Sequence, residues 1–315
     1  MSIAFLFPGQ GSQVPGILHN LPDHPKVTAT INGASEVLGI DVLSLDTSTA
    51  LSSTSAVQLT LLISGVAIAR ALNDEKASAD IAAGHSIGSF AAAVICGAMS
   101  FHDALKIVDL RGTLMKTMFP SGYGMGAILG LDEKSVDLLI KQIRADNPQL
   151  FISNINSSQQ IIVSGTITSI NNLFELALLK GAHNTKLLNV SVPSHCELLN
   201  PVAEDLKKAM ENVKFNQPSI PYLSNCRARL LRNAEEIKKD LYLEIAQPVR
   251  WYEISRILYE FGARLFIEVG PGHVLSHMIN NDFYDVRTLA MGDTKNGFES
   301  ALFLIKREND QLSNL

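Results

Sequence analysis

The stretch Ile81-Ala82-Ala83-Gly84-His85-Ser86-Ile87-Gly88 joins a short apolar strand to a helix predicted from the apolar run at residues 90–98. Its last five residues have the Gly-x-Ser-x-Gly spacing of a nucleophile elbow. In such a turn a strained serine exposes its hydroxyl, and flanking glycines let the backbone pass closely. The backbone N–H of Ile87 is predicted to donate to an oxyanion beside Ser86. Because the same five residues also fit an ordinary helix cap, the motif alone leaves both interpretations open.

A second glycine-rich turn follows the apolar strand predicted at residues 3–7 and reads Phe7-Pro8-Gly9-Gln10-Gly11-Ser12-Gln13. A loop in this position lies at the carboxyl edge of a parallel sheet, where ligands bind in open α/β folds. This loop is a candidate source of a second oxyanion donor, although the same sequence also fits a simple β-to-α turn. The spacing is not Gly-x-Gly-x-x-Gly, so a dinucleotide site is poorly supported.

Strands and helices alternate on both sides of these turns, which is typical of an α/β domain with a mainly parallel sheet. The middle third has a different order of elements, with four predicted strands and two predicted helices arranged as βαββαβ. Those elements are expected at residues 125–131, 133–144, 151–155, 160–164, 169–180 and 185–190. We therefore predict a large domain made of residues 1–122 and 193–315, with a small domain inserted at 123–192. A further helix is predicted at 196–212.

Composition excludes several classes of protein. The chain has 315 residues, 46% of them hydrophobic and 18% charged, which is ample for a buried core. A net charge of −5 gives no global positive field, so nucleic acid is not an expected partner. Three widely spaced cysteines indicate reduced thiols and no zinc site. No basic leader precedes the first apolar run, and the run at 59–68 is broken by Ser64 and Gly65, so we expect a cytoplasmic protein without a membrane span.

Together with motifs downstream, these turns resemble the malonyl-CoA:acyl-carrier-protein transacylase family. That family has an α/β-hydrolase-like core with a ferredoxin-like insert, which agrees with the predicted elements. Seven blocks in the family's order carry the resemblance: Phe7–Gln13, Gly84–Gly88, Arg111 with Met115, Pro193-Ser194-His195, Asn225, Gln247-Pro248-Val249-Arg250-Trp251, and Glu268-Val269-Gly270-Pro271-Gly272.

The resemblance implies a Ser-His dyad. Ser86 is expected to be the nucleophile that becomes the acyl ester, and His195 its general base and later acid. Gln10 and Ile87 are expected to supply the oxyanion-hole N–H groups. The family positions the histidine through main-chain carbonyls near the residue matching Asn225, so no triad carboxylate is needed. Asn225 itself is expected among the substrate-binding residues, with Arg111, Met115 and Gln247.

The resemblance also implies a substrate pocket that recognises a carboxylate. Arg111, with Met115 four residues later, matches the arginine that pairs with the free carboxylate of malonyl, and Gln247 matches a glutamine in the polar lining. A guanidinium makes two parallel bonds to a carboxylate, which a lysine cannot copy. The sequence also fits an alternative in which Arg111 is a solvent-exposed arginine on the polar face of an amphipathic helix. Cys196 is a rival nucleophile at the start of a predicted helix, but nothing else supports it, so we interpret it as packing.

The elbow's surroundings favour one branch of the family. The run Ser86-Ile87-Gly88-Ser89-Phe90-Ala91-Ala92-Ala93 and the run Tyr123–Ile128 are most similar to the epsilon subunit of malonate decarboxylase, which charges a carrier subunit with malonyl. The alternative is a malonyl-CoA:acyl-carrier-protein transacylase of fatty acid or polyketide synthesis. A more distant alternative is a serine hydrolase or thioesterase, which would need a carboxylate partner for the histidine. A non-catalytic binding subunit is disfavoured by the intact serine, histidine and arginine.

The expected partners are malonyl-CoA and an acyl carrier protein or carrier subunit, whose thiol arm belongs to that partner. No metal or other cofactor is expected. A local basic stretch is a candidate docking surface for an acidic carrier, although a solvated face explains it equally well. Its residues are Arg227, Arg229, Arg232, Lys238 and Lys239.

Overall fold

A sheet of six strands runs through the larger part of the computed structural model, which describes residues 2–119, 121–144, 149–292 and 294–313. The strand order is β10-β9-β1-β2-β7-β8, and every neighbouring pair is parallel except β7 with β8. The strands are β1 (Ser2–Phe7), β2 (Ile81–Gly84), β7 (Tyr222–Leu223), β8 (Leu230–Leu231), β9 (Ala263–Glu268) and β10 (Arg287–Ala290). The α/β class with a parallel sheet is thus confirmed. The predicted ranges 1–122, 123–192 and 193–315 also include residues outside the described ones.

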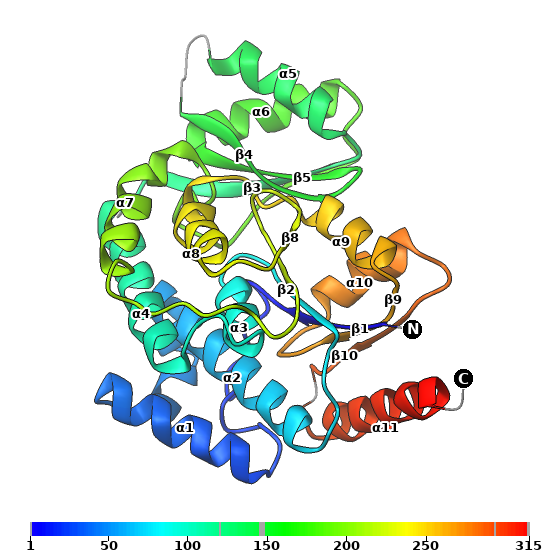
Figure 1. Ribbon diagram of the computed structural model, residues 1–315. Coiled ribbons are helices and arrows are strands. Elements are labelled where there is room, and N and C mark those ends of the chain that lie inside the picture. Colours follow the sequence, from blue (N-terminus) through cyan, green and yellow to red (C-terminus); the bar gives the residue numbers. More distant parts are fainter. Residues whose placement is uncertain (1, 120, 145–148, 293, 314–315) are drawn as a thin grey trace.

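Helices cover both faces of this sheet (Figure 1). Helix α2 is long and apolar enough to cross a membrane, but it lies buried in the core against α1, α3 and α4. Its continuous burial explains why its sequence is apolar all round. The helices of this part are α1 (Pro25–Leu38), α2 (Thr54–Asp74), α3 (Gly88–Ile95), α4 (Phe101–Met118), α7 (Asn200–Ala209), α8 (Ala234–Leu243), α9 (Trp251–Glu260), α10 (Val274–Asp282) and α11 (Thr294–Ser313). Short 3₁₀ turns lie at Val42–Asp46, Ala50–Ser52, Glu197–Leu199 and Glu244–Ala246.

The helix predicted at 196–212 starts later than expected. A 3₁₀ turn, Glu197–Leu199, comes first, and α7 begins at Asn200 with Pro201 in its first turn. Proline is tolerated there but would break a helix interior, because it lacks an N–H and its ring clashes with the preceding turn. Cys196 therefore lies outside the helix in extended backbone, where burial raises the pKa of its thiol to about 12. A buried neutral thiol supports the packing interpretation.

A second sheet, of four antiparallel strands in the order β4-β5-β3-β6, lies above the first in Figure 1, with two helices on its outer face. The elements follow the chain as β3 (Tyr123–Leu129), α5 (Glu133–Arg144), β4 (Leu150–Ser157), β5 (Gln160–Thr166), α6 (Ile167–Leu179) and β6 (Asn184–Leu187). This is the expected order of elements. Strand β6 ends three residues earlier than predicted.

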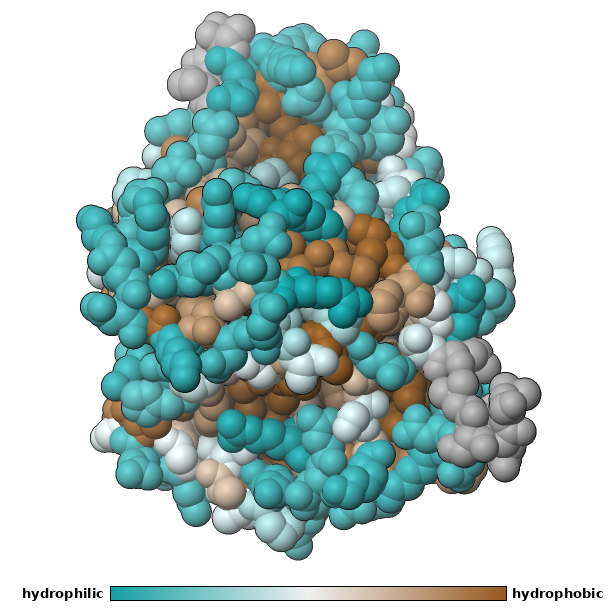
Figure 2. Space-filling view, viewed as in Figure 1, coloured by the Kyte–Doolittle hydropathy of each residue, from teal (hydrophilic) through white to brown (hydrophobic). Residues whose placement is uncertain are grey.

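Backbone and side-chain hydrogen bonds link the small sheet to two loops of the larger part of the chain. Val249 forms a bridge with Asn154 of β4. The hydroxyls of Ser153 and Ser164 both donate to the backbone carbonyl of Ser194, at 3.0 and 2.7 Å. Because Ser194 precedes His195, strands β4 and β5 directly fix the loop that carries this histidine. Figure 2 shows a largely hydrophilic face, with apolar residues visible mainly in the furrows between elements.

Candidate active site

Ser86 lies in the turn between β2 and α3 with a backbone φ of +53°, in the left-handed region that a non-glycine residue rarely adopts. The two glycines of the motif make this turn possible. A Cβ on Gly84 would lie 2.0 Å from the Gly88 carbonyl carbon, and one on Gly88 would lie 2.1 Å from the Phe7 carbonyl oxygen. The turn therefore has the strained backbone geometry of a nucleophile elbow, and it packs against the end of β1.

Asn225 holds this turn from behind. Its Nδ2 donates to the Gly84 carbonyl at 2.8 Å, and its Oδ1 accepts from the Ser86 N–H at 2.9 Å. The Asn225 N–H in turn donates to buried Asp240. We had expected Asn225 among the substrate-binding residues, but it lies behind the serine and outside the cavity lining. Its fully buried amide instead stabilises the strained backbone of Ser86.

His195 faces Ser86 from the loop before α7. Its Nε2 lies 2.7 Å from Ser86 Oγ, and its Nδ1 lies 2.6 Å from the Glu244 carbonyl oxygen. A carbonyl only accepts, so Nδ1 carries the proton and Nε2 is free to accept from the serine hydroxyl. The expected main-chain support is present, but it comes from Glu244, with the backbone of Gln247 as a further partner, and not from Asn225.

The electrostatics of the site keep this histidine neutral. Burial, and after it the positive charge of Arg111, lower the pKa of His195 to about 3. A neutral imidazole is the form that removes a proton from a serine hydroxyl. The pair therefore has the geometry and the protonation state of a nucleophile with its base.

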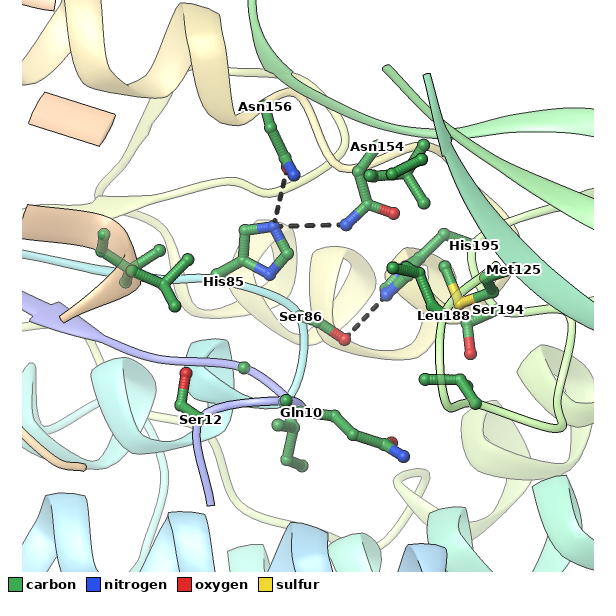
Figure 3. Close-up of a pocket in the computed structure, with 18 of the residues that line it drawn as sticks. Gln10, Ser12, His85, Ser86, Met125, Asn154, Asn156, Leu188, Ser194 and His195 are labelled. Carbon is green, nitrogen blue, oxygen red and sulfur yellow. Dashed lines mark hydrogen bonds between the residues drawn. The ribbon is translucent and has the colours of Figure 1, made fainter. Parts of the chain in front are cut away.

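A cavity of about 460 Å³ opens over this pair between the two sheets. Figure 3 shows Ser86 and His195 side by side, with Gln10 on the far side of the serine. Gln10 and Ile87 both line the cavity, and their backbone N–H groups donate no hydrogen bond within the part of the chain that the structure describes. Unsatisfied amides beside a nucleophile are the donors that an oxyanion requires.

Arg111 projects into the floor of this cavity from α4 and is buried. Its Nη2 donates to Ser86 Oγ at 3.4 Å, and its Nη1 lies 3.5 Å from the sulfur of Met115. Its Nε is buried without a hydrogen-bond partner among the described residues. A buried guanidinium with unused donors can bind an anionic group in the cavity. Met115 lies beside Arg111 and lines the same cavity with an uncharged thioether, and its expected contact with the substrate stays a prediction.

Gln247 does not line the cavity, contrary to our expectation. The 3₁₀ turn Glu244–Ala246 carries the chain so that Gln247 lies half-buried beyond it, with its N–H on the Glu244 carbonyl at 3.4 Å. The polar side chain that this segment brings to Arg111 is Glu244, whose Oε1 lies 3.6 Å from Arg111 Nη2. Sequence reasoning missed this residue because a glutamate at the end of an amphipathic helix resembles its exposed neighbours Glu235 and Glu236.

Three further polar side chains at the cavity were also missed. His85 Nε2 lies 3.2 Å from both Asn156 Oδ1 and Asn154 Nδ2, and its ring packs against Trp251 (Figure 3). Burial lowers the pKa of His85 to about 4, so its ring is neutral. The cluster joins the elbow to β4, and the only sequence signal for it was the polar run that begins at Asn156. Within the described residues, no group of three or more His, Cys, Asp or Glu side chains is arranged to hold a metal ion.

Comparison with known proteins decides the family. Residues 4–302 match the acyl transferase domain family. The chain is 35% identical to the malonyl CoA-acyl carrier protein transacylase of Haemophilus influenzae, over 92% of this chain and 95% of that protein. It is 34% identical to the transacylase of Bacillus subtilis, over 98% of each. The chain belongs to the malonyl CoA-acyl carrier protein transacylase family.

Solved structures of this transacylase family have the same fold. FabD from Acinetobacter baumannii superposes with a TM-score of 0.92 at 33% identity, covering 98% of this chain and 99% of that one. A malonyl-transacylase in complex with its type II PKS acyl-carrier protein gives a TM-score of 0.91 at 33% identity, covering 96% and 99%.

The site of this family member also differs from a triad hydrolase in one respect. The position facing His195 Nδ1, where a hydrolase places a carboxylate, is taken by a backbone carbonyl. A carbonyl fixes the tautomer without adding a negative charge beside the imidazole.

Proposed function

We propose that this chain transfers a malonyl group from malonyl-CoA to the thiol of an acyl carrier protein through an ester on Ser86. The observation that carries the proposal is the buried guanidinium of Arg111 at 3.4 Å from the oxygen of a serine that is itself paired with a neutral histidine. This places a carboxylate receptor next to an acylation centre, which suits an acyl group with a free carboxylate.

The proposed transfer has two matching halves. His195 Nε2 takes the Ser86 proton as Ser86 Oγ bonds to the thioester carbonyl carbon, and the Gln10 and Ile87 N–H groups bind the resulting oxyanion. The carbon–sulfur bond then breaks, His195 returns the proton to the CoA sulfur, and malonyl-Ser86 remains. The carrier thiol attacks the ester by the reverse route, so Ser86 regains its proton.

The names of the relatives support the transacylase assignment of fatty acid or polyketide synthesis better than the malonate decarboxylase epsilon subunit that the sequence favoured. One observation keeps the epsilon subunit as a second candidate. Ser89, which set the elbow apart, donates to the buried carboxylate of Glu244 at 2.5 Å, and Glu244 in turn faces Arg111. Transfer of malonyl to an acyl carrier protein, compared with transfer to a carrier with a phosphoribosyl-dephospho-CoA arm, separates the two.

We further propose that residues 123–192 form a ferredoxin-like insert in an α/β-hydrolase-like catalytic domain made of 1–122 and 193–315. The strand order of the small sheet supports the first description. The strand-turn-helix arrangement around Ser86 supports the second. The insert lines one side of the cavity and would keep water from the ester. Action in the cytoplasm stays a prediction.

Intact-mass measurement after incubation with malonyl-CoA, without carrier, tests the proposal. We expect a malonyl adduct on the unmodified chain and none on Ser86→Ala. Among the described serines that line the cavity, Ser86 is the one whose hydroxyl is paired with a histidine. Folded protein that releases free malonate without an adduct would instead indicate a hydrolase. Folded protein that gives neither product would contradict the malonyl assignment.

The basic stretch remains our proposed docking surface for the carrier. Arg227, Arg229, Arg232 and Lys239 are exposed and Lys238 is half-buried, although Arg229 pairs with Glu236. We expect the double variant Arg227→Glu, Lys239→Glu to raise the KM for an acidic carrier several-fold at low salt. The reason is that long-range attraction between exposed basic residues and an acidic carrier favours their association. The rate of Ser86 malonylation by malonyl-CoA is the matched control and should not change. An unaltered KM for carrier at low salt would exclude this surface.

A further inference from the structure

Glu244 is a buried carboxylate beside Arg111, outside the cavity lining, that the proposed transfer does not use. It begins the 3₁₀ turn after α8 and is fully buried. Its Oε2 accepts from Ser89 Oγ at 2.5 Å, while its Oε1 lies 3.6 Å from Arg111 Nη2 and has no hydrogen-bond partner among the described residues. The same guanidinium therefore faces Glu244 and Ser86.

This arrangement creates a competition for one cation. If Arg111 receives the malonyl carboxylate, two carboxyl groups lie against a single buried guanidinium. Two carboxylates that share a buried site cannot both stay ionised, because their repulsion is only weakly screened there. One of them must therefore bind a proton. Because the substrate carboxylate gains the bidentate contact with arginine, it stays ionised and Glu244 is the group that is protonated.

We propose that malonyl binds to Arg111 only when the Glu244 carboxyl is protonated, so that loading of the substrate above neutral pH is coupled to uptake of one proton by Glu244. This inference rests on the proposed function, because it takes malonyl as the ligand of Arg111. Glu244 then determines the affinity of the site for an acyl group with a free carboxylate, and the pH range over which that group binds.

The surroundings of Glu244 place its titration in an accessible range. Burial raises its pKa to about 8, against the opposing effects of Arg111 and the Ser89 hydroxyl and with the help of Asp240. Asp240 itself accepts hydrogen bonds from Tyr222 and from the Asn225 N–H, and burial raises its pKa.

The other titratable groups that face this cluster are neutral over the same range. Burial raises the pKa values of Tyr222 and Cys226 and keeps both uncharged. His195, whose ring rests on the Glu244 carbonyl, has a pKa of about 3 and is also uncharged. A pH dependence of binding near pH 8 that is lost when Glu244 is replaced by glutamine therefore reports on Glu244.

The sign of the effect follows from the two states. Below pH 8 Glu244 is neutral, and Arg111 is open to the substrate carboxylate. Above pH 8 Glu244 ionises and pairs with Arg111, so malonyl must displace it and a proton must be taken up. We expect the KM for malonyl-CoA to rise by up to about tenfold per pH unit above that point. Acetyl-CoA has no carboxylate, so its KM should not follow this rise.

Steady-state kinetics from pH 6.5 to 9 test the proposal with Glu244→Gln, which keeps the side-chain shape and the carbonyl that holds His195. We expect the rise in malonyl-CoA KM to disappear in Glu244→Gln, while kcat keeps the pH profile of the unmodified protein. Glu235→Gln, an exposed change on α8, is the matched control and should retain the rise. An equal rise in KM in Glu244→Gln and the unmodified protein would overturn the proposal.

Calorimetry of Ser86→Ala gives a second readout that needs neither turnover nor a Glu244 variant. Binding of malonyl-CoA at pH 8.5, in two buffers with different ionisation enthalpies, should show uptake of up to about one proton. Acetyl-CoA carries the same phosphates as malonyl-CoA, so its binding should show only the proton uptake that these phosphates cause. Equal proton uptake for both ligands would overturn the proposal even if Ser86 is malonylated normally, whereas absence of the Ser86 adduct would overturn the proposed function itself.

Discussion

Replacing His195 by alanine is expected to lower the rate of malonyl-Ser86 formation by about 10⁴-fold. Without the imidazole no group accepts the proton of Ser86 Oγ, because the other contact of that oxygen, Arg111, only donates. The remaining rate would come from binding and from the two backbone donors of the cavity. A time course of adduct formation by intact-mass measurement gives the rate directly.

The cavity left by this change provides an internal control. Free imidazole fits the space of the missing ring and should restore part of the rate, which a merely misfolded variant would not permit. The unmodified protein should also acylate at a constant rate from pH 7 down to pH 5, since the pKa of His195 is lowered to about 3 and the ring stays neutral well below pH 6.5. Loss of acylation with a midpoint near pH 6.5 would contradict the role of this buried, neutral histidine.

The sequence predicted best where local chemistry leaves few choices. A Cβ on either glycine beside Ser86 would lie about 2 Å from backbone atoms, so the turn requires the Gly-x-Ser-x-Gly spacing that singled it out. The spacing alone did not distinguish a nucleophile elbow from a helix cap. Arg111 and Met115 are one helical turn apart, and the structure places both at the same cavity. Family membership, inferred from seven short blocks, is confirmed by relatives that cover nearly the whole chain.

The elements that escaped prediction are those whose stability comes from their partners. Helix α1 buries only Val27, Thr30 and Ala34, so its sequence has a weak apolar stripe. Strand β10 is a four-residue edge strand that begins with an exposed arginine, and its register is set by pairing with β9.

Side chains at the site were missed for a similar reason. Neither the helical pattern of α8 nor the residue type distinguishes buried Glu244 from an exposed glutamate, because its environment is made by Arg111 and Ser89 from two distant helices. Gln247 was expected in its place, three residues away, because the sequence does not reveal the 3₁₀ turn between them.

Replacing Arg111 by alanine is expected to lower kcat/KM for malonyl-CoA by about 10²–10³-fold and to raise that for acetyl-CoA. The loss corresponds to about 3–4 kcal/mol, the usual cost of removing one partner of a buried, hydrogen-bonded charge pair. Arg111→Lys should recover only part of it, since an ammonium cannot give two parallel bonds to a carboxylate. Parallel kinetics with both thioesters measure the switch in specificity.

Glu244 explains why the Arg111→Ala protein should still fold. Removal of the guanidinium leaves Glu244 without the cation that lowers its pKa, so the carboxyl binds a proton and no unpaired charge remains buried. The pocket then becomes neutral, which is the condition that an acetyl group requires. Arg70→Ala is the matched control. Arg70 is half-buried over the Phe101 ring, outside the cavity, and its removal should leave the preference for malonyl intact. If Arg111→Ala kept the preference for malonyl over acetyl, some other group would have to recognise the carboxylate, and both the specificity role of Arg111 and its competition with Glu244 would be wrong.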